Sequence, residues 1–312
     1  MRYRQALPQL EGSVLATDGG METTLLFHGG FELPCFASFP LLETGEGRAA
    51  LAAYYEPYLA LARDRGIGFV LEAATWRANP NWGGQLGYSL DRLADANRRA
   101  IGFVEAIRER EETPGRPFPI SAAVGPEGDA YHPEQHLSAD EAERYHAWQV
   151  GVLAETAADL VTALTLTYVE EALGIARAAM AAELPVAVSF TVETDGRLPS
   201  GQPLGEALQQ VDEDERSDVA YLMVNCAHPT HLLPVLEEHG PWDRVRGIRA
   251  NASAKSHTEL DEADELDEGD PDDFARLHRI LRERLPRVAV VGGCCGTDHR
   301  HVTGAVDAWL HA

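Results

Sequence analysis

The apolar positions of the chain fall into eight short runs, which alternate with longer amphipathic stretches. The runs are rich in valine, leucine and alanine, and they predict strands covered on both faces, as in a parallel sheet. These strands are predicted at 14–20, 68–75, 119–126, 160–167, 185–192, 219–226, 244–252 and 287–295. The amphipathic stretches predict helices at 46–65, 90–112, 138–157, 170–183, 204–217, 229–239, 272–284 and 298–311.

Alternating strands and helices indicate the fold class. In an α/β protein of 312 residues, eight strand–helix pairs are enough to close a (β/α)8 barrel, the TIM-barrel architecture, and a doubly wound open sheet is the alternative. No linker divides the chain, so we expect a single domain over residues 1–312. Ser89 and Ser138 predict helix starts. The acidic segment 259–273 is expected to be a solvated excursion between the seventh strand and its helix.

The charge of the chain restricts its partners. Lysine and arginine total 26 against 50 acidic residues, and the net charge of −24 would repel nucleic acid and anionic membranes. We therefore expect small-molecule partners, and the sequence leaves homo-oligomer formation open. No apolar stretch has the form of a signal peptide or the length of a membrane span. A cytoplasmic location is expected, where thiols stay reduced.

Three of the four cysteines stand where predicted strands end. Cys226 ends the sixth strand, and the adjacent Cys294 and Cys295 end the eighth. Barrel enzymes assemble their chemistry at the carboxyl ends of the strands, so these three thiols are expected to converge. Glycines on both sides of the Cys-Cys pair allow the backbone to turn sharply. Cys35, in a loop, is expected to pack as a small apolar side chain.

Three converging thiolates favour zinc as the cofactor. Three protein ligands and one open position are typical of a catalytic zinc site, whereas structural sites are closed by a fourth ligand. A substrate thiol can fill the open position, lose its proton near neutral pH and remain nucleophilic. The reaction that follows from this chemistry is attack of the thiolate on an activated methyl group, which forms a thioether.

Five segments also carry a resemblance to a known family. They are "TDGGMETTL" (17–25), "AAVGPEGDAY" (122–131), "SFTVETDGRLPSGQPL" (189–204), "VNCAHP" (224–229) and "VVGGCCGTD" (290–298). In this order they resemble the landmarks of the homocysteine S-methyltransferase family, which includes enzymes that use S-methylmethionine or betaine as the methyl donor. The resemblance covers nearly the whole chain and implies a (β/α)8 barrel with zinc held by Cys226, Cys294 and Cys295.

The resemblance suggests substrate-binding residues as well. Asp18 corresponds to the family's aspartate that contacts the amino acid part of the thiol substrate, although an aspartate before two glycines can also be a turn residue. Thr75 and Trp76 stand where relatives line the pocket, and the Trp76 ring could hold a cationic donor or only cover the barrel mouth. Asn225 precedes a ligand cysteine and could orient the site by hydrogen bonding, or be a turn residue.

One position departs from the family pattern. Many relatives carry a Glu-Thr pair at the end of the fourth strand, and that glutamate helps to bind the substrate amino group. In "ADLVTALTLTYVEEA" (158–172) its place is taken by Leu164, which cannot neutralise an ammonium group. Either another carboxylate such as Glu72 or Glu193 takes over, or the thiol is not homocysteine in the usual pose.

These observations predict a zinc-dependent S-methyltransferase. The methyl group would move from a sulfonium donor, S-methylmethionine or S-adenosylmethionine, to homocysteine or a related small thiol, and the product would be methionine or another thioether. No general base is needed, because zinc lowers the pKa of the thiol. The alternatives are a non-catalytic zinc and thiol sensor, which Leu164 keeps open, and a betaine-type demethylase on the same fold.

Overall fold

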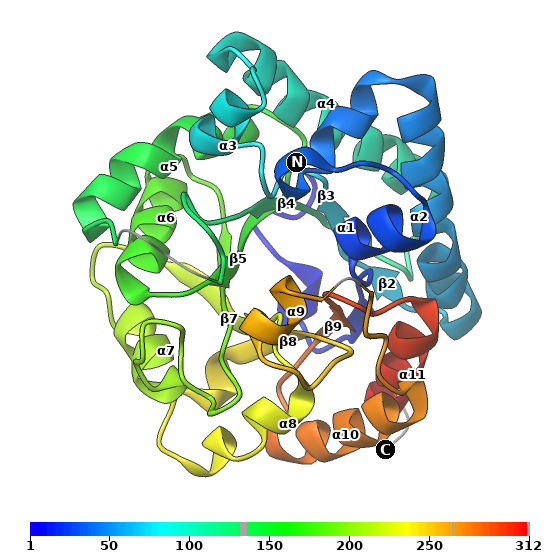
Figure 1. The fold of residues 1–312 in the computed structure, drawn as a ribbon, viewed down its shortest axis with the longest axis vertical. Helices are drawn as coiled ribbons and strands as arrows, with labels where there is room; N and C mark the ends of the chain where they lie inside the picture. Colours follow the sequence, from blue (N-terminus) through cyan, green and yellow to red (C-terminus); the bar gives the residue numbers. More distant parts are fainter. Residues whose placement is uncertain (132–135, 264, 311–312) are drawn as a thin grey trace.

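The computed structural model describes residues 1–131, 136–263 and 265–310, and it places the strands in a central ring surrounded by helices (Figure 1). All neighbouring strands pair in parallel. The strands are β1 Leu15–Ala16, β2 Gly68–Phe69, β3 Leu71–Ala73, β4 Ile120–Val124, β5 Leu160–Leu166, β6 Val186–Phe190, β7 Val219–Asn225, β8 Val245–Ala250 and β9 Val290–Gly293. No helix among the described residues is both long and apolar enough to cross a membrane.

The ring of strands is closed because β2 and β3 are two parts of one strand. Val70 alone separates them, and its amide donates to the carbonyl of Ala16 at 2.8 Å. β2 pairs with β1 and β3 pairs with β4, so the order β2-β1-β9-β8-β7-β6-β5-β4-β3 returns to the strand where it began. The predicted eight-stranded barrel is confirmed, and the open-sheet alternative is wrong.

Helices surround the ring, and most of them cover its outside (Figure 1). They are α1 Met21–Thr23, α2 Gly45–Arg65, α3 Pro80–Gln85, α4 Leu90–Glu111, α5 Ala139–Ala154, α6 Val169–Ala181, α7 Leu204–Asp212, α8 Pro229–Leu232, α9 His257–Asp261, α10 Pro271–Arg284 and α11 His299–Leu310. Ser89 and Ser138 cap α4 and α5 as predicted, because each hydroxyl accepts a hydrogen bond from a first-turn amide. The helix predicted over 229–239 is shorter, since Pro234 separates α8 from a 3-10 turn at Val235–Glu237.

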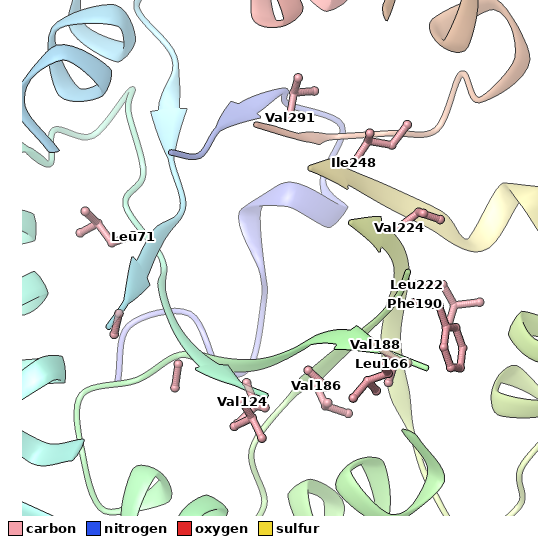
Figure 2. Packing of buried hydrophobic residues seen from close by; sticks show 14 of the residues in the cluster. Leu71, Val124, Leu166, Val186, Val188, Phe190, Leu222, Val224, Ile248 and Val291 are labelled. Atoms are coloured by element: carbon pink, nitrogen blue, oxygen red, sulfur yellow. The ribbon is translucent and has the colours of Figure 1, made fainter. Parts of the chain in front are cut away.

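The apolar core lies on both sides of the ring of strands. Between strands and helices, side chains such as Leu71, Val124, Phe190 and Ile248 point outward (Figure 2). A smaller cluster inside the ring consists of Leu7, Leu15, Val70, Leu160, Ala187, Tyr221, Met223 and Val290. Because side chains alternate in direction along a strand, the next inward positions toward the carboxyl ends lie two residues later. Several of these are polar, namely Thr17, Glu72, Thr162, Ser189 and Asn225.

A histidine in the outer core makes stability depend on pH. His278 of α10 is completely buried, and its Nδ1 accepts a hydrogen bond from Trp309 Nε1 at 3.1 Å. Burial lowers the pKa of His278 to about 3. Between the ordinary histidine pKa and this value, the unfolded chain takes up a proton that the folded chain refuses. The free energy of unfolding therefore falls as the pH falls through this window.

We expect His278→Gln to flatten that dependence. Glutamine can accept the Trp309 hydrogen bond but does not titrate. Between pH 6.5 and 4.5 the wild type should lose about 2 kcal/mol more unfolding free energy than the variant. Urea titrations at both pH values measure the difference, and equal losses in the two proteins would contradict the assignment.

Candidate functional site

A cavity of about 380 Å³ opens among the carboxyl ends of the strands. Residues from β1, β3, β5, β7, β8 and β9, or directly after them, line it, as barrel geometry predicts for a functional site. The predicted site residues in its wall are Asp18, Trp76, Asn225, Cys226, Cys294 and Cys295. Thr75 is the predicted residue that the structure does not place in this wall.

The three predicted metal ligands come together in the cavity wall. The Sγ atoms of Cys226, Cys294 and Cys295 all lie within 4.8 Å of one another, and those of Cys226 and Cys295 are 3.6 Å apart. Zinc–sulfur bonds of about 2.3 Å at tetrahedral angles place two sulfurs about 3.8 Å apart. The three sulfurs therefore fit zinc, and the cavity that they line leaves a side open for a further ligand.

Hydrogen bonds hold the first of these cysteines in an uncommon conformation. Cys226 has a φ of 56°, in the left-handed region that residues with a side chain rarely adopt. Its carbonyl oxygen accepts hydrogen bonds from Thr191 Oγ1 at 3.1 Å, Asn251 Nδ2 at 3.1 Å and His257 Nε2 at 2.9 Å. These contacts offset the strain and fix the direction of the Cys226 side chain.

The second cysteine segment depends on glycine. Gly296 has a φ of 75°, and it follows the Cys-Cys pair directly. A Cβ atom on Gly20 would lie 2.5 Å from the carbonyl oxygen of Cys294, and one on Gly293 would lie 2.0 Å from Thr297 Oγ1. Glycine is needed at Gly296 for its backbone conformation and at the other two positions for close packing around the sulfurs.

The three thiols affect one another's ionisation. The pKa of Cys294 is lowered well below its usual value, because Cys226 and Cys295 hydrogen-bond to its sulfur and the Arg249 guanidinium lies near. The pKa values of Cys226 and Cys295 are raised, because their thiols are held in hydrogen bonds within the cluster and burial disfavours further negative charge. A divalent cation would remove this conflict by stabilising three thiolates at once.

Asn225 is fixed by hydrogen bonds on both ends of its side chain. Its Oδ1 accepts from the Thr165 amide at 2.8 Å and from Ser189 Oγ at 2.7 Å. Its Nδ2 donates to Thr165 Oγ1 at 2.7 Å and lies 3.8 Å from Cys294 Sγ. Thr165 has a φ of 61°, which is an outlier for a β-branched residue. These contacts support the orienting role of Asn225, which stays a prediction.

Arg249 forms an ion-pair network that the sequence analysis missed. Its Nη2 lies 2.7 Å from Asp18 Oδ1, and its Nη1 lies 3.0 Å from Glu72 Oε2. All three side chains are buried. Burial opposes the charge on Arg249, but the two carboxylates outweigh this effect and raise its pKa. Burial also raises the pKa of Glu72. The sequence did carry a signal for this network, because Arg249 is a charged residue at an inward position of the predicted strand 244–252.

Asp18 is already engaged by donors of the chain itself. Its Oδ1 accepts from Arg249 and, at 3.1 Å, from Thr17 Oγ1. Its Oδ2 accepts from the Tyr54 hydroxyl at 2.8 Å. Burial and the negative charge of Asp18 raise the pKa of Tyr54, so this hydroxyl remains a donor. Asp18 therefore lines the cavity where the resemblance implies, but it shares its charge with Arg249.

Thr75 and Trp76 lie in different environments. Thr75 is completely buried, and its hydroxyl donates to the Ala123 carbonyl at 2.7 Å, which ties the end of β3 to β4. Trp76 lines the cavity, and its Nε1 donates to the Leu164 carbonyl at 3.2 Å. The guanidinium of Arg77 lies over the Trp76 ring, 4.1 Å from the centroid. Any cationic substrate on Trp76 must use the other face of the ring.

Tyr131 covers two of the sulfurs, a contact that the sequence analysis did not foresee. Its hydroxyl oxygen lies 3.0 Å from Cys226 Sγ and 3.7 Å from Cys295 Sγ. Its ring stacks on His257 with centroids 4.1 Å apart. On the far side, His257 Nδ1 contacts Glu193 Oε1 at 2.9 Å. Glu193, one of the two suggested partners for an ammonium group, therefore pairs with His257 and does not line the cavity.

The acidic segment 259–273 lies between β8 and α10, as predicted, and many of its described residues are exposed, but it also contributes to the cavity. Its start belongs to α9, which lies over the barrel mouth in Figure 1. Leu260, Asp261, Leu266 and Asp267 line the cavity. The sequence analysis did not predict this contribution to the cavity, because the high density of charge in the segment obscures its two leucines.

The fold and site define an α/β-barrel enzyme with three thiols gathered at the carboxyl ends of its strands. Residues 15–308 match the sequence model of the homocysteine S-methyltransferase family. The chain belongs to this family and is a methyltransferase. No curated protein matches it.

Solved structures of a homocysteine methyltransferase share the fold. The oxidized form of MmuM from Escherichia coli is 19% identical, with a TM-score of 0.73 and coverage of 96% of this chain and 97% of that one. The metallated form of the same enzyme is 18% identical, with a TM-score of 0.70 and coverage of 97% and 99%. At this level of identity, the likeness extends to the architecture of the barrel over its whole length.

Proposed function

We propose that this protein is a zinc-dependent thiol S-methyltransferase. It moves a methyl group from a sulfonium donor, S-methylmethionine or S-adenosylmethionine, to homocysteine or a related small thiol. The observation that carries the proposal is the convergence of the Cys226, Cys294 and Cys295 sulfurs in the wall of the cavity at the barrel mouth. Membership of the homocysteine S-methyltransferase family supports the same chemistry.

The chain's own residues would prepare this site for transfer. Cys226, Cys294 and Cys295 would hold zinc, and Asn225 would keep the Cys294 sulfur in position. When bound, zinc lowers the pKa of a thiol ligand, so that the acceptor sulfur stays nucleophilic at neutral pH. The Tyr131 hydroxyl covers two of the sulfurs, and residues of α9 line the same cavity, so both would limit access of water.

The transfer itself balances without a further reactant. The acceptor thiol gives up its proton to water, and its sulfur forms a bond to the methyl carbon of the donor. The bond between that carbon and the sulfonium sulfur breaks, and its electron pair stays on the departing sulfur as a neutral thioether. For this displacement, the cavity must hold the acceptor sulfur, the methyl carbon and the donor sulfur in one line.

The cavity can accept an ammonium group in spite of Leu164. Asp18, Glu22 and Glu72 line it, and within the described part of the chain Arg249 is their one direct ion-pair partner, so carboxyl groups outnumber the cation that pairs with them. Burial raises the pKa of Glu22, and an incoming cation would favour its ionised form. We therefore keep homocysteine as the first candidate for the acceptor, with these carboxylates in place of the glutamate that the family pattern expects.

Acidic side chains nearer the rim favour a cationic donor. Asp129, Asp261, Glu265 and Asp267 also line the cavity. Their field attracts a sulfonium ion and repels an anionic molecule. A sulfonium donor loses its charge on transfer, so the neutral product is held less strongly than the substrate.

A transfer assay tests the proposal. Purified protein loaded with zinc is incubated with homocysteine and S-methylmethionine, S-adenosylmethionine or betaine, before and after removal of the metal by a chelator. We expect methionine from a sulfonium donor, loss of activity on chelation and recovery when zinc is restored. Binding of homocysteine without any product would favour a sensor, and methionine from betaine alone would favour the demethylase alternative.

A further inference from the structure

Arg77 is a buried cation in the wall of the cavity. It follows Trp76 at the end of β3 and is only 6% exposed. Its guanidinium carbon lies 4.1 Å from the centroid of Trp76 and 3.8 Å from that of Trp82 in α3, so two indole rings fix the plane of the group. This arrangement orients the guanidinium before any ligand arrives.

Arg77 lacks the carboxylate partner that the other buried arginines have. Arg108 lies 2.9 Å from Asp159, and Arg249 pairs with Asp18. Among the described residues, the hydrogen-bond partner of Arg77 is the Gly128 carbonyl, which accepts from Nη1 at 3.0 Å, and no carboxylate oxygen lies within 4.0 Å. The buried Nε atom of Arg77 has no hydrogen-bond partner among the described residues.

A buried cation without a counter-ion in direct contact carries a desolvation cost, which the charges of Asp129 and Glu22 offset only in part. Burial lowers the pKa of Arg77 to about 10, so it remains charged at neutral pH. The planar guanidinium matches a carboxylate, which can take two parallel hydrogen bonds from it. A substrate carboxylate in the cavity would supply the missing partner.

The order of the strands assigns Arg77 to one of the two substrates. The acceptor thiol is placed by its sulfur beside the three cysteines, which follow β7 and β9 on either side of β8. In the closed ring, three strands separate β8 from β4 in either direction. Arg77 donates to the Gly128 carbonyl in the segment after β4, so it lies on the wall opposite the sulfurs. An in-line transfer brings the donor from across the cavity, and hence from the side of Arg77.

We propose that Arg77 binds the carboxylate of the methyl donor, and thus that the donor is a sulfonium ion that carries a carboxylate. This assignment rests on the proposed function and adds a binding residue for one group of the donor. Glu22 and Asp129 are the carboxylates whose charge acts most strongly on Arg77, and they would favour the cationic part of the same molecule. The two indole rings hold the planar guanidinium in a fixed orientation toward the incoming carboxylate.

The test compares S-methylmethionine with its carboxamide, in which a neutral amide replaces the carboxylate. We expect the wild type to use the carboxylate form about 10- to 100-fold better in kcat/KM, as is typical of hydrogen bonds to charged groups. In Arg77→Met this preference should fall to near one. Arg77→Lys keeps the charge but not the planar fork, and it should retain part of the preference. Circular dichroism verifies that each variant is folded.

A second arm distinguishes donor from acceptor. Homocysteine and its carboxamide are compared with S-methylmethionine as the fixed donor, and Arg77→Met should leave this ratio unchanged. If the variant equalises the two acceptors instead, the assignment to the donor is overturned. The matched control is Arg92→Met, since Arg92 lies 4.0 Å over the Tyr88 ring outside the cavity lining.

Binding without the acceptor separates this inference from the proposed function. Titration calorimetry with S-methylmethionine alone should show affinity that falls about 10- to 100-fold in Arg77→Met. Such a loss without any methyl transfer would reject the function and retain the carboxylate site. Transfer that is equally fast for the carboxylate and the carboxamide in the wild type would retain the function and reject the site.

Discussion

Replacement of Cys295 by serine is expected to abolish zinc binding and methyl transfer. The Cys295 sulfur lies 3.6 Å from that of Cys226, and the two sulfurs share one face of the cavity with Cys294. Serine ionises far less readily than cysteine and is a harder ligand, so it cannot replace a thiolate on zinc. Loss of residues that only support metal ligands costs about 10- to 100-fold, and loss of a ligand itself should cost at least about 100-fold.

Metal analysis and the transfer assay measure this effect. Cys35→Ser is the matched control, because Cys35 lies in the turn Pro34–Phe36 and does not belong to the sulfur cluster. It should keep wild-type zinc content and activity. A Cys295→Ser protein with one zinc per chain and full activity would remove the basis of the proposed mechanism.

Replacement of Arg249 by methionine is expected to give the largest loss of stability. The guanidinium separates the buried carboxylates of Asp18 and Glu72, and methionine fills a similar volume without charge. Two buried carboxylates would then face each other without a counter-ion. Breaking a buried ion pair in this way costs about 3–5 kcal/mol of unfolding free energy. Denaturant titration at neutral pH measures the difference.

Two further variants show whether the lost ion pairs are the cause. Arg246→Met is the matched control on the same strand, since Arg246 is not buried and its guanidinium hydrogen-bonds to the Arg287 carbonyl, with no carboxylate partner among the described residues. It should change stability by about 0.5 kcal/mol or less. Adding Asp18→Asn to Arg249→Met removes one of the unpaired charges and should recover part of the loss. Wild-type stability of Arg249→Met would show that the network contributes nothing to the fold.

The pattern of apolar runs was sufficient to predict the barrel. Strands buried on both faces read as continuous apolar segments, and each of the eight predicted strands contains a strand of the structure. Boundaries were less predictable. Pro234 divides the helix expected over 229–239, and α7 ends at Asp212, five residues before the predicted end. Helix ends depend on local capping and tertiary packing, which amphipathic periodicity does not encode.

The convergence of the cysteines was predictable because the fold itself imposes it. Once Cys226, Cys294 and Cys295 are placed at strand ends, parallel strands bring those ends to the same face. The partners of Asp18 were not predictable in this way. Arg249 reaches Asp18 over 231 positions of sequence, and Tyr131 reaches Cys226 over 95. Such contacts depend on side-chain direction and on loops, for which the sequence carries no periodic signal.

The sequence by itself determined the class of architecture, the three thiols and the chemistry that they favour, because strand periodicity and strand-end position are local properties of the chain. The tertiary structure alone decided which charges are paired and which remain available to a substrate. Arg249 lies near the end of one predicted strand and Arg77 shortly after another, yet one is bound to two carboxylates and the other lies over two indole rings. That difference arises from where side chains of distant segments meet, since charge pairing depends on distance in space.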